Sequence, residues 1–82
     1  MALSVDLRRT RGYLVADSRG RMLGKVECPL YGTSPETPDA IAVSRGVLFR
    51  RRRLVPAQAI EVVDSSSQVI GLRVPRDAIT SF

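Results

Sequence analysis

Four consecutive arginines, at positions 50 to 53, are the part of this sequence best suited to chemistry. A guanidinium group forms paired hydrogen bonds to carboxylates and phosphates, so such a cluster can bind an anionic partner. Neighbouring side chains of a strand point to opposite faces, so one face cannot present all four. We therefore expect a bulge or a position at the rim of the domain. Two interpretations stay open: a solvated rim whose aliphatic stems cover apolar surface, or a patch that faces anions.

Basic residues also occur elsewhere in the chain, which has twelve arginines, one lysine and a formal net charge of +5. A basic domain attracts acidic proteins, nucleic acids or anionic lipid, and charge alone does not choose among them. Nucleic acid is the weaker candidate, because the aromatic residues Tyr13, Tyr31, Phe49 and Phe82 form no adjacent pair for base stacking. We predict a partner-binding basic surface made of Arg8, Arg9, Arg11, Arg45, Arg50, Arg51, Arg52 and Arg53.

Residues suited to catalysis or metal binding are scarce. The chain has no histidine, the usual general base at neutral pH, and only one cysteine, Cys28. Cys28 falls on the apolar side of an alternating segment, which predicts a buried packing residue. Asp17 and Asp64 stand at turns, where aspartate caps backbone amides. The sequence therefore predicts a binding protein that is not an enzyme and has no cofactor or metal site.

The elements that position these residues are short strands separated by turns. Apolar and polar residues alternate from Val26 to Leu30, which is typical of a half-buried strand. Ile79 and Phe82 are expected to cover one end of the sheet. We expect strands over 12–16, 21–31, 40–43, 47–55, 60–63 and 68–74, a main loop over 32–39, and helical turns at 56–59 and 76–82.

Several residues have types that suit turns and bends. Asp17 and Gly20 suit a type I turn closed by a left-handed glycine. Gly24 and Gly71 each lie seven residues after a turn aspartate, and we expect both to bend a strand. Pro29 indicates a broken ladder or a sheet edge. The predicted structural turn residues are Asp17, Gly20, Gly24, Gly46, Pro56 and Gly71.

The order of these signals resembles the PRC-barrel family, named after the cytoplasmic domain of the photosynthetic reaction centre H subunit. The resemblance lies in residues 12–17 with 20–27, in Leu54-Val55-Pro56 followed by Ala59-Ile60, and in 69–74 with 75–79. It implies a barrel used for interaction. Family members include a domain beside a membrane electron-transfer complex, the C-terminal domain of a ribosome maturation factor, and assembly or cell-division adaptors.

The length of 82 residues suffices for one domain with a thin stability margin. Either a homodimer or a monomer with a well-filled core would compensate for this low stability, and both alternatives stay open. The single thiol and the lack of an apolar leader or of about 18 consecutive apolar residues favour the cytoplasm, with no transmembrane segment.

These inferences combine into one expectation for fold and function. We expect a basic N-terminal arm over 1–11 and a PRC-barrel-like domain over 12–82. The fold would be all-β: a small, six-stranded, antiparallel PRC-like β-barrel with a short C-terminal helical turn. The function would be that of an adaptor or assembly module that docks onto a larger protein complex through a partner's acidic surface. The alternative is an accessory factor in RNA processing or ribosome maturation.

Overall fold

A computed structural model describes residues 7–32, 38–46 and 51–79. Over these residues the chain forms one six-stranded sheet, and its helical elements are two 3-10 turns. This confirms the predicted all-β class and the six strands. The elements are β1 (Leu14–Ala16), β2 (Met22–Leu30), β3 (Ala40–Arg45), β4 (Arg51–Pro56), η1 (Ala57–Ala59), β5 (Ile60–Asp64), β6 (Val69–Leu72) and η2 (Arg76–Ala78).

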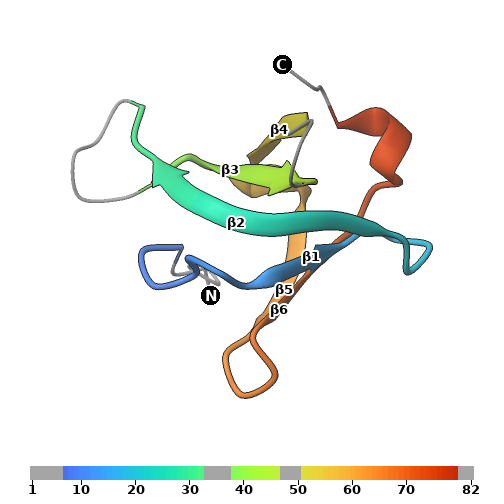
Figure 1. Cartoon of the computed structure of the whole chain (residues 1–82), viewed down its shortest axis with the longest axis horizontal. Coiled ribbons are helices and arrows are strands. Elements are labelled where there is room, and N and C mark those ends of the chain that lie inside the picture. Colours follow the sequence, from blue (N-terminus) through green and yellow to red (C-terminus); the bar gives the residue numbers. More distant parts are fainter. Residues whose placement is uncertain (1–6, 33–37, 47–50, 80–82) are drawn as a thin grey trace.

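The strands lie in the order β4-β3-β2-β1-β6-β5, and the sheet curls strongly (Figure 1). All neighbouring pairs are antiparallel except β1 and β6, which run parallel. The prediction of an antiparallel sheet is therefore wrong for this pair: β6 reaches β1 from the far end of the chain and not through a hairpin. The described sheet is also not closed. Because η1 turns the chain between β4 and β5, these consecutive strands do not pair, and they form the two edges.

The long strand β2 is bent by a glycine. Gly24 has a φ of +143°, and a Cβ at this position would collide with the carbonyl oxygen of Ser44. The ladder shifts register beside it, where Val15 pairs with Gly24 but Ala16 pairs with Met22. Glycine is therefore required here for β2 and β3 to approach closely.

The other predicted turn residues lie where chain direction or pairing changes. Gly20 closes the turn between β1 and β2 with a φ of +78°, and its N–H donates to the carbonyl of Asp17 at 3.0 Å. Gly46 follows β3, and Pro56 is the last residue of β4. Gly71 lies in β6 opposite a register shift in β5.

The core lies between the curled strands and includes part of the predicted N-terminal arm. Leu7 is fully buried, and the Thr10 hydroxyl donates to the Leu7 carbonyl at 2.8 Å, so Leu7 and Thr10 pack as part of the domain. Ile79 is buried at the other end of the chain, whereas Phe82 lies outside the described residues. The core cluster consists of Leu7, Val15, Leu23, Val26, Ile41, Val43, Val55, Ala59, Ile60, Ile70, Leu72 and Ile79.

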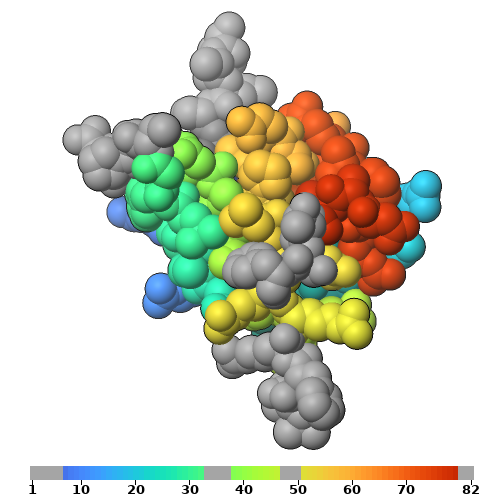
Figure 2. Space-filling model, turned by 90° about the horizontal axis from the view of Figure 1, so that it is seen from above, coloured from blue at the N-terminus to red at the C-terminus, as the bar shows by residue number. Residues whose placement is uncertain are grey.

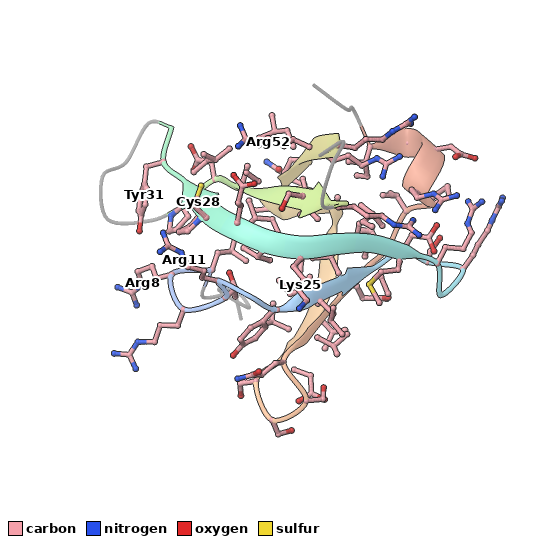
Figure 3. The ribbon with its side chains drawn as sticks, viewed as in Figure 1. Arg8, Arg11, Lys25, Cys28, Tyr31 and Arg52 are labelled. Carbon is pink, nitrogen blue, oxygen red and sulfur yellow. The ribbon has the colours of Figure 1, made fainter. Side chains whose placement is uncertain are left out.

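Cys28 is only partly buried, so the prediction of a buried packing residue is wrong. The ladder between β1 and β2 ends at Lys25, so β2 has only β3 as a strand neighbour around Cys28 and Pro29. Side chains in this half of β2 are therefore less covered. Figure 3 shows Cys28 close to Tyr31 at this end of the strand.

Candidate anion-binding site

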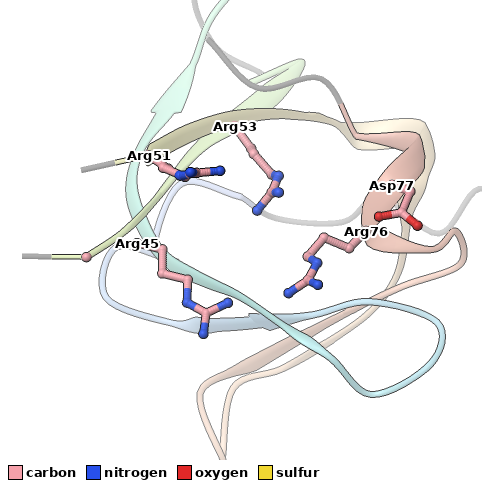
Figure 4. Close-up of a pocket in the computed structure, with 6 residues that line it drawn as sticks. Arg45, Arg51, Arg53, Arg76 and Asp77 are labelled. Carbon is pink, nitrogen blue, oxygen red and sulfur yellow. The ribbon is translucent and has the colours of Figure 1, made fainter. Parts of the chain in front are cut away.

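Four arginines from three elements line one pocket (Figure 4). Arg45 comes from the end of β3, Arg51 and Arg53 come from β4, and Arg76 comes from η2. The pocket has a volume of about 420 Å³, and Gly46 and Asp77 complete its described lining. In Figure 4 the guanidinium groups of Arg45, Arg53 and Arg76 point into the same space. Such a constellation can hold a carboxylate or phosphate through several charge-assisted hydrogen bonds.

The strand register explains why three of these arginines meet. Arg51 and Arg53 are two residues apart, so they share a face of β4. Arg51 is the direct partner of Arg45 across the ladder, which places Arg45 on the same face. Further along this face, Val43 and Val55 belong to the core. The three arginines therefore lie on the core-facing side of the sheet, just past its last apolar residues.

Asp17, in the turn between β1 and β2, fixes the backbone of the fourth arginine. Its carboxylate accepts a hydrogen bond from the backbone N–H of Arg76 at 2.7 Å, across 59 residues of sequence. It also accepts from the backbone N–H groups of Arg19 and Arg21, at 2.9 and 2.7 Å, and from Nε of Arg21 at 3.2 Å. The buried Asp17 side chain thus ties the turn between β1 and β2 to the start of η2, together with the N–H of Ser18, which donates to the carbonyl of Val74 at 3.0 Å.

Asp17 is ionised in this setting. Burial opposes ionisation, but the hydrogen bonds from the backbone of Arg76, Arg21 and Arg19 and from the Arg21 side chain outweigh it and lower the pKa of Asp17 from 3.8 to about 2. Asp64 caps the other predicted turn. Hydrogen bonds from Ser66 and Ser67 lower its pKa to about 2, but these bonds are local and exposed.

The pocket carries an excess of positive charge. Asp77 is the one acidic residue in its described lining, and the Asp77 Oδ2 atom lies 3.7 Å from Nη2 of Arg21, which is outside the lining. The Nε atom of Arg53 is buried and makes no hydrogen bond with the residues that the structure describes. Because like charges repel in a partly buried space, an oxyanion from outside would be stabilising here.

The predicted basic surface is divided by the fold. Arg45, Arg51 and Arg53 come together in the pocket, whereas Arg52 lies on the other face of β4, where its Nε is 3.3 Å from Oε2 of Glu27. Arg8, Arg9 and Arg11 are exposed in the segment before β1, and Arg8 and Arg11 lie toward the C-terminal end of β2 in Figure 3. Arg50 lies outside the described residues.

Sequence reasoning missed Arg76 and Asp77 as site residues. They follow the last strand, and no spacing in the sequence connects them with the arginine run. The signal that brings Arg76 to the pocket is the bond to Asp17, and the sequence alone indicates only a local turn role for that aspartate.

A second, apolar pocket lies beside the same strand. Leu54 and Pro56, from the outer face of β4, form it with residues of η1 and of the C-terminal segment, and its volume is about 420 Å³. Leu54 is 40% exposed, which is high for a leucine in a sheet. Figure 2 shows β4, in yellow, and the segment around η2, in red, on one face of the molecule. The C-terminal segment contributes Val74, Ala78 and Ile79 to this apolar pocket, and η1 contributes Gln58 and Ala59.

The described residues contain no helix that is long and apolar enough to cross a bilayer. Within the same residues, no three histidine, cysteine, aspartate or glutamate side chains cluster as potential metal ligands.

No family model matches this sequence, and no curated protein is significantly similar to it. The resemblance to PRC barrels therefore stays a prediction from the motifs.

Proposed function

We propose that this chain is a non-catalytic adaptor that docks onto an acidic segment of a larger protein assembly. Carboxylates of the partner would enter the pocket of Arg45, Arg51, Arg53 and Arg76, and an apolar side chain would cover Leu54. The observation that carries the proposal is that four arginines line one pocket with a single carboxylate in its described lining.

The energetics favour this arrangement as an interaction site. A hydrogen bond to a charged group contributes about 1.5–3 kcal/mol, so two or three of them can orient a partner and supply much of a micromolar affinity. The positive charge of the clustered arginines also steers an acidic partner toward the pocket during encounter. The neighbouring apolar pocket adds a contact that salt does not screen.

Charge reversal at Arg51 and Arg53 tests the proposal by affinity capture from cells of the source organism. The matched control is charge reversal at Arg9 and Arg11, which changes net charge equally at exposed positions outside the pocket. We expect partners that withstand nuclease treatment to be lost with Arg51→Glu/Arg53→Glu and kept with Arg9→Glu/Arg11→Glu. Equal recovery with both variants would reject the pocket as the docking site. Nuclease-sensitive recovery would favour an accessory role in RNA processing or ribosome maturation.

We further propose that the curled sheet is a PRC-type barrel with an open seam between β4 and β5, and that the protein works in the cytoplasm. The order of strands and turns supports the first point, and the single thiol supports the second. A crystal structure in which β4 pairs with β5 would contradict the open seam and would leave no edge of β4 for a partner strand. The predicted homodimer is tested separately by light scattering, with one protomer per particle counting against it.

A further inference from the structure

We infer that the acidic partner segment binds as an extended strand that pairs antiparallel with the outer edge of β4. This inference rests on the proposed function, because the same arginines would hold the partner's carboxylates. It adds the conformation, the direction and the residue pattern of that segment.

The ladder between β3 and β4 determines which backbone groups of β4 face away from the sheet. Pro56 has no N–H, so its pair with Ala40 cannot be a hydrogen-bonded pair. Just beyond this pair the N–H of Ala57 donates to the carbonyl of Asp39 at 2.8 Å, which ties the end of β4 to the start of β3. Bonded and non-bonded pairs alternate in an antiparallel ladder, so Arg52 and Leu54 turn their N–H and C=O groups away from β3.

Among the described residues, no second strand pairs with these outward groups. β4 is the first strand of the sheet order, and among described residues it pairs with β3 alone. Two N–H and two C=O groups, spaced two residues apart, match the requirement of an added strand. Proline at the end of β4 limits the pairing to this stretch, which argues for a short, specific ligand strand and against open-ended association.

The side chains along β4 specify what the ligand strand should carry. Residues directly opposite each other in a ladder lie on the same face. Positions opposite Arg51 and Arg53 would thus be directed toward the arginine pocket and favour glutamate or aspartate. The position opposite Leu54 would lie at the apolar pocket and favour a large aliphatic residue. Because an antiparallel partner passes Pro56 first and Arg51 last, its apolar residues would precede its acidic residues.

Fluorescence anisotropy with the labelled, amidated peptide Val-Val-Leu-Glu-Thr-Glu tests this inference. In the proposed register the peptide's leucine lies opposite Leu54 and its first glutamate lies opposite Arg53. N-methylation of the leucine removes an N–H that would bond to β4, whereas N-methylation of that glutamate blocks an N–H that points away from β4. We expect the first change to weaken binding by about tenfold or more, and the second by less than about threefold. The reversed sequence Glu-Thr-Glu-Leu-Val-Val should bind more weakly than the parent.

The outcomes separate this inference from the docking proposal. If both N-methylated peptides bind like the parent while Arg51→Glu/Arg53→Glu abolishes binding, strand pairing is overturned and acidic docking stands. If the reversed peptide binds as well as the parent, the antiparallel direction is overturned. If the parent does not bind at millimolar concentration, strand pairing is again overturned, and the affinity capture decides independently on docking.

Discussion

Replacing Gly24 by alanine tests how the frame of the arginine pocket is held. The backbone of Gly24 has a φ of +143°, which residues with a Cβ rarely adopt. An added Cβ would collide with the carbonyl oxygen of Ser44 and lie 2.8 Å from its carbonyl carbon. Both atoms belong to the backbone of β3, so a side-chain rotation cannot relieve the contact. Since Arg45 follows Ser44, the displacement would reach the pocket.

The expected loss of stability follows from these contacts. The unfavourable backbone conformation costs about 1–3 kcal/mol and the overpacking about 1–3 kcal/mol, while the lower entropy of the unfolded alanine variant returns about 0.4–1 kcal/mol. The net effect of Gly24→Ala is therefore about 3 kcal/mol, in a domain whose total stability is on the order of 4–12 kcal/mol.

The matched control is Gly20→Ala. Gly20 also has a positive φ, of +78°, but a Cβ there would meet no atom within 4 Å. An alanine in this left-handed conformation costs about 1–2 kcal/mol, and the lower entropy of the unfolded variant offsets part of that cost. The net loss of stability for Gly20→Ala is therefore about 1 kcal/mol.

Urea unfolding followed by circular dichroism measures both variants. With a slope of about 1 kcal/mol per molar urea, the midpoint should fall by about 3 M for Gly24→Ala and by about 1 M for Gly20→Ala. Equal midpoints for the two variants would refute the argument from the close approach of β2 and β3.

Two further predictions concern the charges around the pocket. Asp17 has a pKa of about 2 in the fold and 3.8 as its ordinary value, so the stability it contributes is present above about pH 4 and is lost as the pH falls toward 2. Asp17→Asn should therefore lower the stability of the fold at pH 7, and it should flatten the fall of the urea midpoint between pH 4 and 2.5. Asp64→Asn should lower the stability at pH 7 by less, because the hydrogen bonds of Asp64 are local. Equal losses of stability in the two variants would contradict this. Inorganic phosphate should raise the melting temperature more than chloride at equal ionic strength, by relieving repulsion in the pocket. Arg53→Gln should reduce that difference and Arg9→Gln should not; an unchanged difference in Arg53→Gln would place the anion elsewhere.

Much of the local structure could be predicted because single residues determine it. Aspartate and glycine form the turn between β1 and β2, Gly24 bends β2, and Pro56 ends β4. Such features depend on the conformational limits of one or two residues. The pairing of β1 with β6 could not be predicted in this way. Leu14 and Val69 are partners across more than half the chain, and alternation of apolar residues indicates a face but not a neighbouring strand.

The candidate site was predictable to the extent that it depends on strand periodicity. Arg51 and Arg53 share a face by their spacing, and the same spacing sends Arg52 to the other face, so the predicted surface of eight arginines could not stay together. The place of Arg45 depends on the register of β3 against β4, and that of Arg76 depends on a hydrogen bond across 59 residues. Neither is encoded in a local pattern.

The pocket remains cationic because the nearby carboxylates already interact with other groups. Asp17 accepts hydrogen bonds from Arg19, Arg21 and the backbone of Arg76, and Asp77 lies near Arg21. On the far face of β4, Glu27 contacts Arg52. The buried carboxylate of Asp17 therefore fixes the backbone at Arg76 without neutralising the four guanidinium groups. Four arginines with one carboxylate in the described lining are the charge imbalance that the proposed acidic partner would compensate.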